Sequence, residues 1–188
     1  MESRFGIIDG VIRTRVGYAG GRMNNPTYRH IGDHTETVQV DYDPGYITYK
    51  ELLEIFWRSH RPTGQSSRRQ YLNAVFYHHE SQRKAALASK TEWQQKLGAD
   101  IQTEVAPLRS FTMAEAHHQK YILKRNAVLK EEMVRIYPHH ADFVDSTAVA
   151  RLNGYAGGNG SRHRLLQELD RLGLSPSGQK TLLGMVQR

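Results

Sequence analysis

Residues 11–45, VIRTRVGYAGGRMNNPTYRHIGDHTETVQVDYDPG, decide the fold expected for this chain. Their first part predicts a strand from Val11 to Tyr18, because Ile12, Val16 and Tyr18 share one face of an extended segment. The strand runs into the glycine-rich segment from Gly17 to Gly21, which predicts a turn at its end. A polar loop follows, so the chain is expected to reverse direction here.

The second part of this stretch predicts another strand, from Thr35 to Tyr42, and a turn at Asp43 to Gly45. Val38, Val40 and Tyr42 alternate with polar residues and define the face to be buried. Two strands joined by a glycine-rich loop are therefore expected to start a sheet.

The chain then alternates between helix and strand signals. Capping boxes at Thr48–Glu51 and Thr112–Glu115 predict the starts of two helices. A longer helix is expected from Glu80 to Leu97, ending at the glycine that follows. Further strands are expected at 71–78 and 101–106. Strands interspersed with helices indicate an α+β fold, here a two-layer mixed sheet with packed helices.

The last part of the chain differs in pattern, because residues 138–188 contain short helical segments separated by glycine and proline. We therefore expect one main domain at 1–137 and a helical C-terminal extension at 138–188. The pentapeptide Gly-Tyr-Ala-Gly-Gly of residues 17–21 recurs at 154–158. Its flanking residues show no similarity, so it does not indicate an internal repeat.

Composition limits the possible function classes. The chain has 188 residues, 38% of them hydrophobic, which is enough for one substantial core. It contains neither a membrane-spanning run nor a signal peptide, so a cytoplasmic, monomeric protein without membrane contact is expected. The net charge of +7 permits nucleic-acid binding. Because the basic residues are interspersed with acidic ones and no binding motif is present, nucleic acid is not the expected partner.

Cysteine and histidine counts decide what metal and thiol chemistry the chain can perform. It contains no cysteine, so no residue of this sequence can act as a thiol nucleophile or form a disulfide. Several of its ten histidines are adjacent doublets, and neighbouring side chains point to different faces. We therefore expect neither a metal site nor a bound cofactor.

Glu36 is the first candidate for a chemical role. Strict alternation places its side chain on the same face as Val38 and Val40. Burial would raise the pKa of a carboxyl group there and allow it to donate a proton near neutral pH. The alternative is a glutamate at a strand end that reaches solvent or an arginine, and alternation alone favours that alternative.

Tyr28 and Tyr71 are the next candidates. Tyr28 closes the segment Asn25-Pro26-Thr27-Tyr28, and Tyr71 is expected to begin a strand after a polar loop. A phenol donates a hydrogen bond while presenting an apolar ring, which suits a pocket for a small polar group beside a methyl group. The alternative is two ordinary tyrosines, which the spacing does not exclude.

Several segments occur in a characteristic order. They are Gly17-Tyr18-Ala19-Gly20-Gly21, Asn25-Pro26-Thr27-Tyr28, His34-Thr35-Glu36, Tyr42-Asp43-Pro44, Phe56-Trp57 with His60, Gln70-Tyr71, Thr103-Glu104-Val105-Ala106-Pro107 and His118-Gln119-Lys120-Tyr121. This order and spacing resemble the A-type peptide methionine sulfoxide reductases over about the first two thirds of the chain. An ordered set of this kind is more specific than any single motif.

The resemblance implies a reductase of the S-epimer of methionine sulfoxide, free or in proteins, and so a role in protein repair under oxidative stress. By matching positions, it assigns Glu36 as the proton donor and Tyr28 and Tyr71 as donors to the sulfoxide oxygen. It implies no bound cofactor. It does imply an external thiol reductant, thioredoxin or a small dithiol, for a protein that carries the family's nucleophilic cysteine.

That nucleophile lies, in the family, in the segment Gly-Cys-Phe-Trp-Gly. Residues 1–6 resemble those that directly follow this segment, so the sequence is expected to be truncated at its N-terminus. The alternative is a non-catalytic relative that binds methionine sulfoxide or another partner. Two further departures from the family are a shorter turn between Tyr28 and Glu36 and the absence of a carboxylate from residues 63–69.

Overall fold

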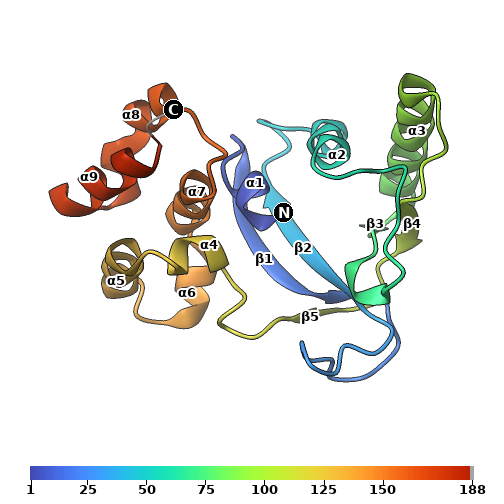
Figure 1. Ribbon diagram of the computed structural model, residues 1–188, viewed down its shortest axis with the longest axis horizontal. Helices are drawn as coiled ribbons and strands as arrows, with labels where there is room; N and C mark the ends of the chain where they lie inside the picture. The colour runs from blue at the N-terminus through green and yellow to red at the C-terminus, as the bar shows by residue number, and fades with distance from the viewer. Residues whose placement is uncertain (187–188) are drawn as a thin grey trace. The chain divides into compact units, whose positions relative to one another are not determined.

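The computed structural model describes residues 1–186, which form two compact units. Unit 1 contains residues 1–15, 38–43 and the chain from 116 onward; unit 2 contains residues 16–37 and 44–115. Each described unit has its own helices, drawn in Figure 1. Small sheets and many helices confirm the expected α+β class.

Strand β1 (Val11–Ala19) is the middle strand of a three-stranded sheet with the order β2-β1-β5. Strand β2 spans Thr35–Tyr42, as the alternation predicts, and β5 spans Phe111–Met113. β5 runs antiparallel to β1, with Tyr18 opposite Thr112. A Cβ atom at Gly17 would lie 2.5 Å from the Thr112 carbonyl oxygen, a backbone atom, so a glycine is required for this close pairing.

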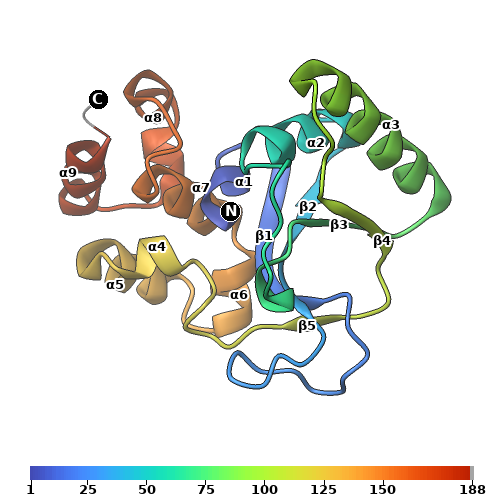
Figure 2. The same cartoon turned by 45° about the vertical axis from the view of Figure 1, so that its right-hand side comes forward.

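A second, two-stranded sheet lies within unit 2. Its strands β3 (Ala74–Tyr77) and β4 (Glu104–Pro107) are parallel. Helices α2 (Tyr49–Arg58) and α3 (Glu80–Leu97) pack against each other, and α3 also contacts both strands, as Figure 2 shows. The Trp57 indole is 1% exposed in this core and donates a hydrogen bond to Ser89 Oγ at 3.0 Å.

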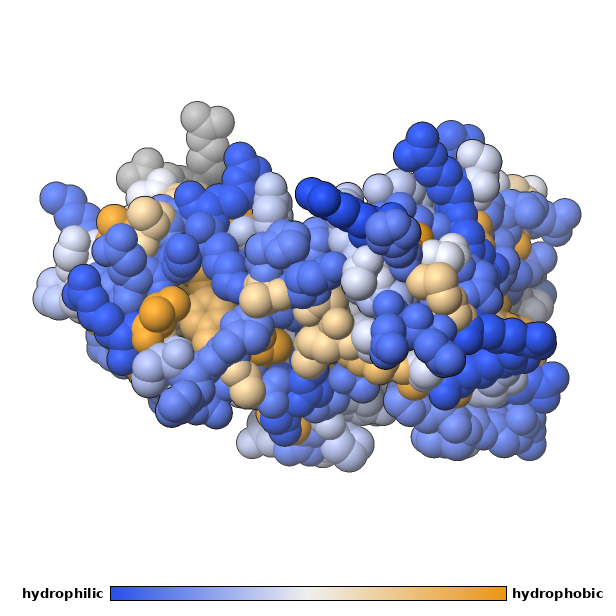
Figure 3. All heavy atoms as spheres, turned by 90° about the horizontal axis from the view of Figure 1, so that it is seen from below, coloured by the Kyte–Doolittle hydropathy of each residue, from blue (hydrophilic) through white to orange (hydrophobic). Residues whose placement is uncertain are grey.

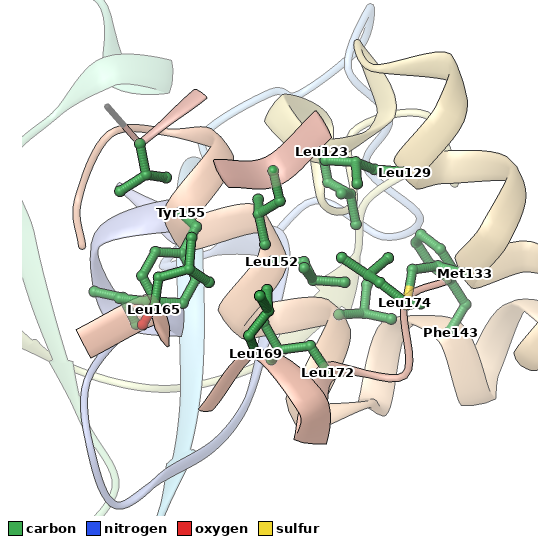
Figure 4. Packing of buried hydrophobic residues seen from close by; sticks show 14 of the residues in the cluster. Leu123, Leu129, Met133, Phe143, Leu152, Tyr155, Leu165, Leu169, Leu172 and Leu174 are labelled. Carbon is green, nitrogen blue, oxygen red and sulfur yellow. The ribbon is translucent and has the colours of Figure 1, made fainter. Parts of the chain in front are cut away.

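Helices make up most of unit 1. Their bounds are α1 Glu2–Gly6, α4 Tyr121–Lys124, α5 Ala127–Ile136, α6 His140–Asp145, α7 Thr147–Ala156, α8 Arg162–Glu168 and α9 Pro176–Met185, with a 3₁₀ turn η2 at Leu169–Leu172. Figure 4 shows their common core, in which Leu123, Leu152 and Leu165 are fully buried. This core joins residues on both sides of position 137, and the expected division there into domain and extension stays a prediction.

Helices α1 and α7 of unit 1 pack closely against each other. A Cβ atom at Gly6 would lie 2.4 Å from the Ala150 carbonyl oxygen, and one at Gly154 would lie 2.8 Å from Ile7 Cβ. Gly154 begins the second Gly-Tyr-Ala-Gly-Gly segment, which is helical through Ala156, whereas residues 17–19 are extended. The two segments are therefore not a structural repeat.

Local signals predicted several boundaries correctly. Thr48 caps α2 with the expected capping box, and α3 ends at Gly98, whose φ of 60° is left-handed. The expected helix at Thr112–Glu115 is wrong. Residues 111–113 form β5, because pairing with β1 outweighs the local capping pattern, and the next helix begins only after Lys120.

Three smaller expectations are also wrong. Ile12 is 41% exposed, whereas Tyr18 is 1% exposed, so only part of the apolar set expected for β1 is buried. Tyr71 does not begin a strand but ends a 3₁₀ turn, η1 (Arg69–Tyr71), and β3 starts at Ala74. The strand expected from Ile101 likewise begins at Glu104.

The part of the surface that Figure 3 draws is mostly polar. On the face drawn in Figure 3, hydrophilic residues predominate and hydrophobic residues form smaller patches between them. Among residues 1–186, no helix combines the length and apolar character that crossing a membrane requires.

Candidate functional site

Unit 2 contains all three residues that the sequence singles out. Glu36 lies in β2, Tyr28 in the loop between β1 and β2, and Tyr71 at the end of η1. The hydrogen bonds described below connect these three elements.

Glu36 accepts a hydrogen bond at its Oε1 atom from Gln70 Nε2 at 2.6 Å. Its side chain is half-buried, between the buried carboxylate and the solvent-exposed one that the sequence left open. The reason is that every residue from 36 to 42 of β2 is half-buried, so neither face of the strand is fully covered. Alternation identified the strand but not the depth of its side chains.

The turn η1 is attached to its neighbours at several points. Thr35 Oγ1 donates a hydrogen bond to the Arg69 carbonyl oxygen at 3.0 Å. The Arg69 guanidinium donates in turn to both Glu104 carboxylate oxygens at 3.1 Å and to the Asp33 carbonyl oxygen at 3.2 Å. These contacts hold Gln70 and Tyr71 beside the start of β2.

Tyr28 and Tyr71 meet through their side chains. The hydrogen bond between them is the main cause that raises the pKa of Tyr28 above its usual value, and the charges of Tyr71 and Glu36 act in the same direction. Tyr28 is 40% exposed and Tyr71 is 45% exposed. The two phenols and the Glu36 carboxylate are therefore close enough to influence one another while remaining accessible.

A further pair of residues, Tyr18 and Glu115, lies next to this group. The Tyr18 hydroxyl donates to Glu115 Oε2 at 2.5 Å, and the Tyr28 backbone N–H donates to Glu115 Oε1 at 2.9 Å. Burial, followed by the hydrogen bond and charge of Glu115, raises the pKa of Tyr18; Glu36 adds to this effect. Tyr18 therefore remains a neutral phenol near neutral pH.

The loop that carries Tyr28 is fixed at both ends. The Asp33 carboxylate accepts hydrogen bonds from the backbone N–H groups of Met23 and Arg22, which lower the pKa of Asp33. His34, 1% exposed, accepts from Gly21 N at 3.3 Å and donates through Nε2 to the Met23 carbonyl oxygen at 2.9 Å. These contacts close the loop just before Glu36.

Sequence reasoning did not identify Gln70, Tyr18 or Glu115 as partners within this group. Gln70 and Tyr18 belonged to segments that were noted only as motifs, and Glu115 was interpreted as part of a capping box. No group of histidine, aspartate and glutamate side chains within residues 1–186 has the arrangement of a metal site. What the site offers is two carboxylates, Glu36 and Glu115, and several hydroxyl or amide donors, which suits a small polar acceptor.

Comparison with known proteins identifies the family. The family model described as peptide methionine sulfoxide reductase matches residues 1–152. A peptide methionine sulfoxide reductase of Drosophila melanogaster is 41% identical over 179 residues, covering 94% of this chain and 71% of the relative. Peptide methionine sulfoxide reductase A5 of Oryza sativa subsp. japonica is 42% identical over 161 residues, covering 82% of this chain and 63% of that protein.

Solved structures agree with these relatives. Methionine sulfoxide reductase A of Corynebacterium diphtheriae superposes with a TM-score of 0.62 at 34% identity, covering 68% of this chain and 69% of that chain. The reduced form of Mxr1 from Saccharomyces cerevisiae gives a TM-score of 0.59 at 34% identity, covering 63% and 74%. The sequence order of motifs, the family model and these structures lead to one conclusion: the chain belongs to the A-type peptide methionine sulfoxide reductase family.

Proposed function

We propose that this chain recognises methionine S-sulfoxide, free or in proteins, through the sulfoxide oxygen. Glu36 is the proton donor in this proposal, and Tyr28 and Tyr71 are the hydrogen-bond donors. The observation that carries it is the meeting of these residues in unit 2, where the two phenols share a hydrogen bond and the Glu36 charge acts on Tyr28.

The chemistry of a sulfoxide explains why these groups are suited to it. The S–O bond is strongly polarised, so its oxygen accepts hydrogen bonds and its sulfur is open to attack by a nucleophile. Phenol donors stabilise the negative charge on that oxygen, and a carboxylic acid can protonate it as the S–O bond breaks. Gln70 donates to Glu36 Oε1, which leaves the transferable proton to Oε2.

Reduction also needs two electrons, which a thiolate supplies. When a thiolate attacks the sulfoxide sulfur and the oxygen takes up a proton, the products are a thioether and a sulfenic acid on the attacking sulfur. A dithiol then reduces the sulfenic acid back to the thiol; the dithiol is oxidised to a disulfide, and the oxygen leaves as water. This chain contains no cysteine, so the thiolate must come from outside the sequence described here.

Binding can be tested without turnover because the chain has no thiol. Titration of the chain with N-acetyl-methionine S-sulfoxide, followed by NMR, should show saturable shifts in unit 2. Tyr28→Phe, Tyr71→Phe and Glu36→Gln should each weaken binding by about 3- to 10-fold, the effect of one lost hydrogen bond. Tyr46→Phe is the matched control, because Tyr46 is 79% exposed. Equal affinity for the sulfoxide and for N-acetyl-methionine would contradict recognition through oxygen.

The proposal also includes a reductant, an oligomeric state and a cellular location. We expect thioredoxin or a small dithiol to act as the reductant for a cysteine-containing form, and the protein to be a cytoplasmic monomer. Sedimentation and cell fractionation test the last two expectations. Reduction kinetics with thioredoxin and dithiothreitol, compared side by side, test the first.

A second function is favoured by one observation, the absence of cysteine from the sequence. The chain would then be a non-catalytic module that binds methionine sulfoxide. Adding Gly-Cys-Phe-Trp-Gly before Met1 distinguishes the two functions. Consumption of the S-epimer, but not the R-epimer, by the extended protein with dithiothreitol would support a reductase framework. A folded extended protein with a titratable thiol and no activity would support the module.

A further inference from the structure

We infer that Glu115 is a positioning residue of the sulfoxide site, which holds the backbone of Tyr28 against the buried Tyr18 hydroxyl. The inference rests on the proposed function and adds to it the device that fixes one of the two oxygen donors. Neither Glu115 nor Tyr18 is among the residues that the family resemblance assigned to chemistry.

The position of Glu115 is set by the β1–β5 ladder. Tyr18 is opposite Thr112, and the Ala114 N–H continues the ladder by donating to the Val16 carbonyl oxygen at 3.0 Å. Glu115 is the next residue after that hydrogen bond. Its backbone therefore leaves a paired strand at a defined point, and its side chain starts from a rigid element.

Glu115 uses its two carboxylate oxygens for two different partners. Oε2 accepts from the Tyr18 hydroxyl at 2.5 Å, and Oε1 accepts from the Tyr28 N–H at 2.9 Å. Tyr18 is 1% exposed, and a buried hydroxyl of this kind needs a hydrogen-bond partner. Because donors occupy both oxygens, Glu115 is placed to hold the loop and not to donate a proton to substrate.

The geometry of the loop explains why Tyr28 needs such a partner. Thr27 and His30 form a tight turn, with Thr27 N donating to His30 O at 3.2 Å and His30 N donating to Thr27 O at 3.1 Å. Tyr28 is the second residue of this turn, and the N–H at that position takes no part in the turn's own hydrogen bonds. Glu115 accepts it. The carboxylate thus fixes the direction in which the Tyr28 side chain leaves the loop.

The charge of Glu115 also acts on the Tyr18 phenol. Together with burial, Glu115 raises the pKa of Tyr18, and the same tyrosine responds to the charge of Glu36 and to Tyr28. Two carboxylates therefore lie around one buried phenol. Alanine at 115 removes the charge and both acceptors, whereas glutamine removes the charge and one acceptor but keeps a side-chain oxygen for Tyr28 N.

Three variants of the full chain test the role. Glu115→Ala removes both acceptors and should weaken binding of N-acetyl-methionine S-sulfoxide about tenfold, while binding of N-acetyl-methionine stays within twofold of wild type. Glu115→Gln should keep sulfoxide binding within about threefold, because its carbonyl oxygen still accepts from Tyr28 N. Glu115→Asp is shorter by one methylene group and should resemble alanine. If Glu115→Ala does not fold, Glu115→Asp takes its place in the test.

A spectroscopic measurement separates positioning from simple stabilisation. In the free protein, the Tyr28 amide proton should move upfield in Glu115→Ala and remain near its original shift in Glu115→Gln. Wild-type sulfoxide affinity in Glu115→Ala, with Tyr28→Phe still weakened, would overturn the inference and leave the proposed function intact. If the wild-type chain does not bind the sulfoxide while the amide shift responds as expected, the proposed function fails and the site role of Glu115 fails with it.

Discussion

The Lys120 ammonium lies 2.8 Å from Glu2 Oε1, in an ion pair that is buried within unit 1. The same nitrogen donates to Thr14 Oγ1 at 3.0 Å, and the Lys120 backbone N–H donates to Glu2 Oε2 at 2.9 Å. Burial lowers the pKa of Lys120, and the charge of Glu2 opposes that effect. The pair thereby attaches helix α1 to β1 and to the residue that precedes α4.

Replacing one member of this pair should be costly. Lys120→Met would leave the Glu2 carboxylate buried without its cation, which costs about 3–5 kcal/mol in free energy of unfolding. Urea denaturation followed by circular dichroism measures the change. Lys130→Met in α5 is the control, since Lys130 is exposed and should change stability by less than about 0.5 kcal/mol. A loss below about 1 kcal/mol in Lys120→Met would show that the pair is not needed.

Close packing of α1 against α7 leads to a second prediction. An added methyl group at Gly154 would lie 2.8 Å from Ile7 Cβ and 3.0 Å from the Ser3 carbonyl oxygen, so Gly154→Ala should destabilise the protein by about 1–3 kcal/mol. Gly184→Ala in α9 is the matched control. It meets no atom within 4 Å and should stabilise the helix by about 0.5–1 kcal/mol. If both variants shifted the melting temperature in the same direction relative to wild type, the result would contradict this account.

The loss of folding stability at low pH should depend on Asp145. The Arg15 guanidinium, at 2.7 Å, lowers the pKa of this carboxylate below its ordinary value of 3.8, and Arg13 contributes as well. Because the folded-state pKa is lowered, the stabilisation is present above pH 3.8 and is lost as the pH falls through the folded-state value.

Asp145→Asn tests this contribution by chemical denaturation at a series of pH values. The variant should be less stable than wild type by about 1–2 kcal/mol at pH 6, a modest figure because the side chain is partly exposed. The difference should shrink as both proteins are taken below about pH 3. Asp142→Asn, on the same helix, is the control. A difference that stays constant from pH 6 to pH 2 would rule out the ion pair as its cause.

Alkaline titration tests the contact between the two exposed phenols. Tyr71→Phe removes the hydrogen bond that raises the pKa of Tyr28, so Tyr28 should ionise closer to its ordinary value of 10.0. Tyrosine-selective ¹³C NMR between pH 8 and pH 12 resolves the individual groups. Glu36→Gln should shift Tyr28 in the same direction by a smaller amount, and Tyr46→Phe should not shift it. An unchanged Tyr28 in Tyr71→Phe would mean that the phenols do not meet in solution.

Sequence alone predicted the elements whose signals are local. The capping box at Thr48 and the glycine at position 98 fixed the ends of α2 and α3, because each depends on a few neighbouring residues. Strand β2 was predicted from its alternation with correct bounds. The capping pattern at Thr112 failed because pairing with a strand far away in the sequence decided the conformation.

The candidate site was harder to predict from the sequence pattern alone. Glu36, Tyr28 and Tyr71 were singled out from their positions in the sequence, but their roles came from the family resemblance and stay a prediction. Their partners could not be derived, because the hydrogen bonds to Gln70 and Glu115 join residues distant in sequence, and no local spacing encodes such contacts. The pattern also left the depth of Glu36 open: alternation placed its side chain on the face of Val38 and Val40, and both faces of β2 are half-buried.

The contact between α1 and α7 can form only late in synthesis. Helix α1 emerges from the ribosome before unit 2, whereas α7, the helix packed closely on it, follows only after the whole of unit 2 has been translated. Unit 2 can therefore begin to fold while the side of α1 that packs on α7 is still uncovered. We expect a nascent chain that is stalled before residue 147 to hold that side open to chaperones, and to release them when α7 arrives.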